Sequence, residues 1–351
     1  MSEKNTTTLE PVPGAEGASA ASQPHGLRRI LSGSGARSLG LVIALGLLVA
    51  VGAATSGSQF LSVDNLLTIL RYGSILGVIS IGMTFVITAG GIDLSVGSVM
   101  GLASVMASLA AVQAAATNSS WLLMLAVALG VGAAAGLING VIIAYGRVVA
   151  FIATLAMLVA ARGVAELVSG RNTLIVTNRD FTSVLRSNVL GIPLLVWIFA
   201  LVAAAGWFLL NKTTFGRRTV AIGGNLEAAR LAGIKVKRHI VWLYILSGTT
   251  AGIAGVMMMG RTTAGTSTHG LLYELDAIAA VVVGGTLLVG GRGTIMGTVL
   301  GVLLFATLTN VFTQNNLDTS VQNVTKGAII VLAVLIQQRF AVPGNRRKGA
   351  I

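Results

Sequence analysis

Long apolar stretches separated by short polar segments make up most of the sequence from residue 39 onward. Most of them are long enough to cross the roughly 30 Å hydrocarbon core of a bilayer as helices. The pattern therefore predicts an all-α polytopic membrane protein with about ten transmembrane helices. The predicted spans lie near residues 39–55, 65–89, 95–116, 121–145, 148–169, 190–210, 240–260, 272–291, 294–313 and 321–338.

One apolar stretch is interrupted by two glycines and a single acid. Gly90 and Gly91 precede Asp93, after which apolar sequence resumes. Two adjacent glycines let the backbone leave the helix, which exposes N–H and C=O groups without helical hydrogen bonds. Because hydrocarbon cannot bond these groups, we expect this bend to be buried in protein or to line a wet cavity. An acid at membrane depth is a functional candidate, with Ser95 and Ser98 as polar neighbours. The alternative is a cytoplasmic turn whose Asp-x-Ser sequence only caps the next helix.

The same glycine pattern recurs in the C-terminal half. Broken helices in both halves of a membrane protein are typical of a transporter with an internal repeat and a pathway near the repeat interface. Coincidence is the alternative, because small residues are common where membrane helices pack. The matching residues are Gly90, Gly91 and Gly97 in the first copy and Gly290, Gly291 and Gly297 in the second.

The predicted spans place the two bends on the same side of the membrane, whereas an inverted repeat would place them on opposite sides. Either the repeat is parallel or one span is miscounted. The segment around Arg162, Gly163 and Glu166 is the candidate for a half-length or re-entrant helix, because it places charges inside a span.

Composition and charge support a membrane protein and set its orientation. The chain is 54% hydrophobic and 10% charged, and its net charge of +13 is concentrated in tails and one loop. Basic residues flanking apolar spans mark the cytoplasmic side, which favours membrane topology over nucleic-acid binding. We therefore expect a disordered cytoplasmic tail at 1–38, a transmembrane domain at 39–338 with a cytoplasmic loop at 211–239, and a basic cytoplasmic tail at 339–351.

The largest predicted outside segment, residues 170–189, carries three arginines. Arg171, Arg179 and Arg186 either are solvated or locally paired, or contact an acidic surface of a soluble partner.

The sequence contains no motif that indicates catalysis or metal binding. There is no cysteine, and His25, His239 and His269 lie too far apart in sequence for a metal site to be indicated. No phosphate-binding Gly-x-x-x-x-Gly-Lys-[Ser/Thr] loop and no nucleophile–base pair are present. The sequence thus predicts no catalytic residue, no metal, no cofactor of its own and no enzymatic activity.

The basic loop contains the pattern of a short helix. Asn225 is placed as its N-cap, Glu227 lies in the first turn, and Gly233 follows where a C-terminal cap falls. We interpret this segment as a rigid surface helix through which a partner subunit moves the membrane part. The alternative is a solvated connector.

Three motifs resemble the ribose-type branch of binding-protein-dependent ATP-binding cassette (ABC) importer permeases. Glu227-Ala228-Ala229 followed by Gly233 is similar to the coupling-loop signature of that family. The segment from Gly90 to Gly97, the run Gly223-Gly224-Asn225, and the stretch from Asp276 to Gly301 resemble its other hallmarks. The resemblance covers roughly residues 40–338 and implies that the coupling loop, with Asn225, Glu227, Ala228, Ala229 and Gly233, docks on an ATPase.

The resemblance also implies the partners. They are a second permease copy forming a homodimer, a cytoplasmic ATPase dimer that binds the ATP, and a periplasmic sugar-binding protein, assembled in a bacterial inner membrane. Membrane lipid is a further partner, and nucleic acid is not one.

The sparse interior charges favour a neutral cargo. They are few and of both signs, whereas a charged solute needs a compensating partner in a low-dielectric route. A neutral sugar or polyol fits, and which one stays open. The rival is an ion-coupled secondary transporter that uses Asp93, Glu166 or Asp276, and a membrane-embedded enzyme is a third class.

Overall fold

The structure, a computed structural model, describes residues 34–341. The predicted tails 1–38 and 339–351 lie mostly outside the described residues, and their inner ends continue the first and last helices. The helices are α2 (Ser34–Phe60), α3 (Val63–Thr88), α4 (Val96–Ala107), α5 (Ala110–Asn118), α6 (Leu122–Ala144), α7 (Ala150–Ser169), α8 (Arg179–Leu185), α9 (Leu194–Lys212), α10 (Thr214–Gly224), α11 (Leu226–Leu231), α12 (Val236–Thr262), α13 (Tyr273–Val283), α14 (Ile295–Gln314) and α15 (Thr319–Ala341).

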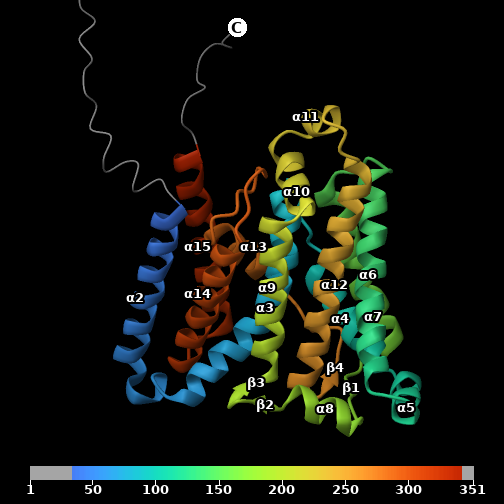
Figure 1. Cartoon of the computed structure of the whole chain (residues 1–351). Coiled ribbons are helices and arrows are strands. Elements are labelled where there is room, and N and C mark those ends of the chain that lie inside the picture. Colours follow the sequence, from blue (N-terminus) through green and yellow to red (C-terminus); the bar gives the residue numbers. More distant parts are fainter. Residues whose placement is uncertain (1–33, 342–351) are drawn as a thin grey trace, which may run out of the picture.

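The long helices form one bundle, with α10 and α11 at one end and α8 at the other (Figure 1). At that second end, two-residue strands form two antiparallel pairs. The strands are β1 (Leu174–Ile175) with β4 (Ala264–Gly265), and β2 (Asn188–Val189) with β3 (Ile192–Pro193).

The all-α polytopic fold is confirmed, whereas the count of ten spans is not. Each predicted span contains a helix, but in the described residues seven are long and apolar enough to cross a membrane alone. α4 and α5 meet at a bend of 58° and are long and apolar enough only together, so they add an eighth crossing if the bent pair is one broken span. The predicted span 272–291 contains only the 11-residue α13, because its second half is a glycine-rich loop.

The predicted half-length helix around Arg162, Gly163 and Glu166 is wrong. These residues lie in α7, which is one continuous 20-residue helix. The two charges are tolerated because Arg162 bonds inside the bundle and Glu166 lies near the end of the helix. The half-length elements are α4 and α13 instead.

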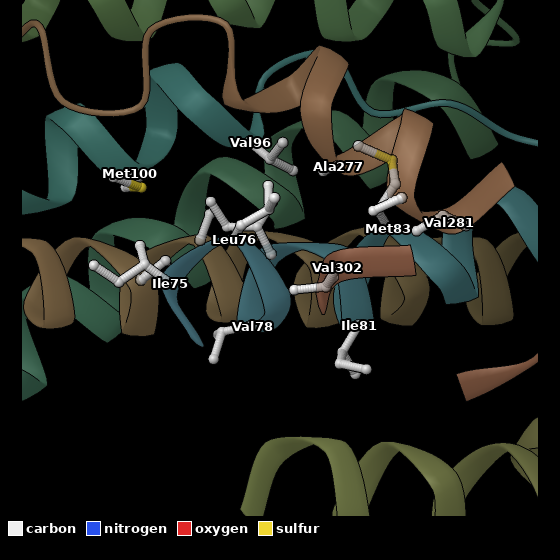
Figure 2. Packing of buried hydrophobic residues seen from close by; sticks show 14 of the residues in the cluster. Ile75, Leu76, Val78, Ile81, Met83, Val96, Met100, Ala277, Val281 and Val302 are labelled. Carbon is white, nitrogen blue, oxygen red and sulfur yellow. The ribbon is translucent and has the colours of Figure 1, made fainter. Parts of the chain in front are cut away.

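α3 is the central helix of the bundle. Its residues from Gly73 to Thr88 are all buried, on every side of the helix, which explains why its sequence is apolar all round. Figure 2 shows Ile75 and Met83 of α3 packed among Val96 of α4, Ala277 of α13 and Val302 of α14. The core of the protein therefore forms around α3 and the two half-length helices.

α6 and α12 pack with their backbones almost in contact along a glycine seam. A Cβ placed on Gly132 or Gly136 of α6 would collide with backbone atoms of α12, and one on Gly248 would collide with α6. Small residues that repeat every fourth position allow this close approach in membrane helices.

Two discontinuous crossings have opposite directions. α3 and α12 are antiparallel, because Tyr72 near the start of α3 lies under Arg261 near the end of α12, while Ile92 beyond α3 accepts a hydrogen bond from Tyr244 near the start of α12. Each long helix is followed by a non-helical segment and then a half-length helix: 89–95 with α4, and 263–272 with α13. An inverted relation thus joins α3–α4 with α12–α13, and the glycine pairs themselves do not mark it.

Candidate transport and coupling site

Asp93 is fully enclosed in a hydrogen-bond network between three helices. Its side chain is 1% exposed. One carboxylate oxygen accepts hydrogen bonds from the backbone N–H (3.0 Å) and hydroxyl (2.6 Å) of Ser95, and the other accepts from the hydroxyl of Ser247 at 2.8 Å. Asn139 of α6 donates to the Ser95 hydroxyl at 3.0 Å. The acid therefore ties the start of α4 to α12 and, through Ser95, to α6.

The depth of Asp93 favours the buried interpretation of the bend. Ser247 lies near the middle of the 27-residue α12, roughly 16 Å along the helix axis from its first residue. Asp93 accepts from the N–H of Ser95, the residue before α4, and among the described residues no side chain makes a capping hydrogen bond to the first turn of that helix. This bond lies inside the bundle rather than in a solvent-exposed turn. Ser98, the second predicted polar neighbour, is buried on α4, and its hydroxyl has no hydrogen-bond partner.

The two glycine pairs meet. The backbone N–H of Gly291 donates to the carbonyl of Thr88 at 2.9 Å, which joins the loop before α14 to the end of α3. Gly290 has a φ of +85°, and a Cβ there would lie 2.9 to 3.0 Å from the backbone of Gly90. Positive φ and close approach both require glycine at this position.

α10 packs directly onto this junction. A Cβ on Gly223 would collide with the Thr88 carbonyl and would lie 2.5 Å from the Gly291 nitrogen, whereas a Cβ on the neighbouring Gly224 would meet nothing within 4 Å. We call Thr88, Gly90, Gly223, Gly290 and Gly291 the glycine junction. Through this junction α10 contacts the end of α3 and the loop that joins α13 to α14.

The predicted loop helix is present as α11. The side chain of Asn225 accepts from the Ala228 N–H at 2.9 Å and caps the helix, and Gly233 follows it with a φ of +81°. Glu227 is exposed in the first turn and lies 3.7 Å from Arg230. Ala228 is exposed, whereas Ala229 is buried. The preceding helix α10 was not predicted.

The other predicted glycines, Gly97 and Gly297, lie outside the junction. Gly97 at the start of α4 packs against the backbone of Gly270, just before α13, and close to the carboxylate of Glu274. The beginnings of the two half-length helices therefore meet. Gly297 packs against Gly284 at the other end of α13.

Glu274 and the residues around it were missed by the sequence analysis. Arg162 donates to the carbonyl of His269 at 3.0 Å, and the ring of His269 lies 3.1 Å from the Ser104 hydroxyl. Glu274 is 8% exposed, and its Oε2 has no hydrogen-bond partner. Glu274 was missed because it lies near the start of a stretch that the sequence predicts as a membrane span. Ser247 was missed because it lies among the small and apolar residues of another predicted span.

Two of the acids assigned to ion coupling in the rival interpretation form ion pairs, whereas Asp93 is hydrogen-bonded to serines. Glu166 forms a partly exposed ion pair with Arg171 at 3.3 Å. Asp276 of α13 forms a more enclosed pair with Lys326 of α15 at 2.8 Å. Of the described residues, no three His, Cys, Asp or Glu side chains gather as a metal site.

These features define a polytopic membrane protein with two interrupted crossings and a helical loop packed on the breaks. The chain belongs to the family described as branched-chain amino acid transport system / permease component, whose model matches residues 65–334. This is a family of transport permeases, so the chain is not an enzyme.

Curated relatives place the resemblance in the sugar-transporting branch. The chain is 41% identical to the ribose import permease protein RbsC of Haemophilus influenzae over 84% of this chain and 90% of the relative. It is 41% identical to RbsC of Bacillus subtilis over 86% and 92%, and 36% identical to the L-arabinose ABC transporter permease protein AraH of Azospirillum brasilense over 80% and 81%. No solved structure matches the chain. The resemblance to ribose-type permeases is thereby confirmed.

Proposed function

We propose that this chain is the membrane subunit of an ABC importer that moves a neutral sugar or polyol inward. A periplasmic binding protein delivers the cargo, and a separate cytoplasmic ATPase dimer drives the movement. Two copies of the permease form the pathway in a bacterial inner membrane, and both termini face the cytoplasm. The names of the relatives support a sugar as cargo.

The contact of α10 with the glycine junction is the observation that carries this proposal. α10 and α11 are exposed at one end of the bundle and lead through Gly223 to Thr88 and Gly291. A force applied to α11 by the ATPase is therefore transmitted to the end of α3 and to the loop between α13 and α14. Because tightly packed backbones do not deform gradually, such a contact shifts between discrete arrangements.

Three of the interior charges are already bonded within the protein, which supports a neutral cargo, although the buried Oε2 of Glu274 has no hydrogen-bond partner. Asp93 accepts three hydrogen bonds, Arg162 bonds the His269 carbonyl, and Asp276 pairs with Lys326. A charged solute would need a free countercharge along its route. Hydroxyl groups of a sugar need only hydrogen-bond partners and water.

The experiment compares Gly223→Ala with Gly224→Ala in proteoliposomes that contain the permease, its ATPase and the binding protein. Both substitutions add one methyl group to the end of the same helix. We expect Gly223→Ala to reduce ATP-driven ribose uptake by tenfold or more, because its Cβ collides with the Thr88 carbonyl. Gly224→Ala is expected to retain normal uptake. Equal uptake by the two variants, or uptake by the permease without the ATPase, would contradict the proposal.

A further inference from the structure

A basic cavity lies beside the loop helices and is separate from the glycine junction. It has a volume of about 530 Å³ and is lined by residues of α10, the loop after α11 and the first turns of α12. Every lining side chain that can ionise is basic. These side chains are Arg218, Lys235, Arg238 and His239.

His239 lines the cavity, but its ring is already bonded within the protein and is not free to bind a ligand. Its ring is buried, lies 2.8 Å from the Thr219 hydroxyl and packs at an interplanar angle of 41° against Phe215, with ring centroids 4.4 Å apart. The exposed cations are Arg218, Lys235 and Arg238. Lys235 is the N-cap of α12 and makes no side-chain capping bond, so the positive end of the helix dipole adds to the field of these cations.

An apolar groove continues from this cavity along α9 and α12. It has a volume of about 380 Å³ and shares Phe215 and Trp242 with the basic cavity. Its other lining residues are Leu209, Ile245, Leu246 and Thr249. The basic cavity and the apolar groove therefore meet at Phe215 and Trp242, which line both.

Two tryptophans mark the level of the membrane surface at this place. Trp242 is 51% exposed and Trp207 of α9 is 41% exposed, with Lys212 lying 5.5 Å above the Trp207 ring. Exposed tryptophans gather at the interface between hydrocarbon and headgroups. The basic cavity thus lies at headgroup level, and the groove lies at the level of the acyl chains.

We propose that this cavity and groove bind one anionic phospholipid of the cytoplasmic leaflet. The phosphate is held by Arg218, Lys235 and Arg238, and an acyl chain lies in the groove past Phe215 and Trp242. Charge complementarity and the apolar continuation both favour a lipid over a soluble anion. Only the assignment to the cytoplasmic leaflet rests on the proposed function.

The test uses two double variants that remove equal charge from the same two helices. Arg218→Gln/Arg238→Gln alters the cavity lining, whereas Arg217→Gln/Lys237→Gln removes two neighbouring exposed cations that do not line it. The full chain is purified in detergent, stripped of lipid and titrated with dioleoyl phosphatidylglycerol, with native mass spectrometry as the readout. Dioleoyl phosphatidylcholine and glycerol 3-phosphate serve as the neutral-lipid and chain-free probes.

We expect the cavity variant to raise the Kd for phosphatidylglycerol about thirtyfold relative to the matched variant, without affecting phosphatidylcholine. Arg218→Lys/Arg238→Lys should restore binding, which separates loss of charge from misfolding. Equal loss in both double variants would show general surface attraction and overturn the site. Full competition by glycerol 3-phosphate, or unchanged lipid binding with weakened ATPase assembly, would also overturn the lipid assignment. The titration needs neither cargo nor ATPase, so its failure leaves the transport proposal standing.

Discussion

Asp93 shows how a single residue can be recognised in the sequence while its partners cannot. The glycine pair and the isolated acid marked the bend, and the structure buries that acid in the bundle. Its partner Ser247 lies 154 positions away, and Asn139, which donates to Ser95, lies 44 positions from that serine. Serine and asparagine in glycine-rich helices carry no local signal of such pairing, because membrane helices commonly contain small polar residues at their interfaces.

Asp93→Ala is expected to reduce sugar uptake strongly while the protein still inserts into the membrane. The substitution leaves the Ser95 N–H and the hydroxyls of Ser95 and Ser247 without their acceptor. Each buried donor left unpaired costs about 1–3 kcal/mol. Asp93→Asn retains an oxygen acceptor and should show a smaller defect.

Uptake and thermal unfolding are measured for both Asp93 variants and for Asp180→Asn, which alters an exposed acid on α8. Normal uptake in both Asp93 variants would mean that the acid has no role in holding the broken crossing.

At the scale of elements, regular helices were predictable and interruptions were less so. The sequence indicated α11 from its cap residues, and Asn225 makes the expected bond. It did not indicate α10, whose basic and small residues resemble a connector. It assigned the half-length helix to α7 because of its charges, whereas the half-length helices are α4, which is apolar, and α13, whose two acids lie in its first turn. Sequence composition alone does not show that part of a membrane crossing is non-helical, as it is beside α4 and α13.

Glu227→Lys tests whether α11 transmits force. The substitution places a positive charge at the positive end of the helix and opposite Arg230, which costs about 0.3–1 kcal/mol at an exposed position. We expect this small cost to leave the fold intact while substrate-stimulated ATP hydrolysis is lost.

The matched control is Arg230→Gln, which also breaks the Glu227–Arg230 pair but leaves the first turn acidic. Stimulation that survives in Glu227→Lys would identify α11 as a connector only.

At the scale of the whole molecule, an enclosed ion pair joins two helices that are far apart in the sequence. The Asp276–Lys326 pair, with side chains 19% and 15% exposed, fixes α15 to the half-length helix α13. Neither the pair nor the contact between the glycine pairs could be predicted from one sequence, because each joins segments whose relative position depends on the complete fold.

The cargo is expected to be neutral. In the complete assembly, uptake of labelled ribose should be inhibited by an unlabelled neutral pentose or hexose and unaffected by amino acids, peptides and phosphate esters. The measurement is a competition assay in proteoliposomes. Competition by a charged amino acid with none from any neutral sugar or polyol would transfer the chain to the amino-acid-transporting members of the family.

The hydrogen bond from Gly291 to Thr88 can form only late in biosynthesis, after both residues have been made. About 200 residues separate its two ends, and at roughly 5–20 residues per second the ribosome needs about 10–40 s to supply the second. During that interval α3 is already made, but its final carbonyl lacks its native partner. The first half of the protein therefore lies in the membrane with the Thr88 carbonyl at the end of α3 not yet bonded to Gly291. Nascent chains shorter than about 290 residues should consequently expose this end to quality-control proteases, while longer chains become protected.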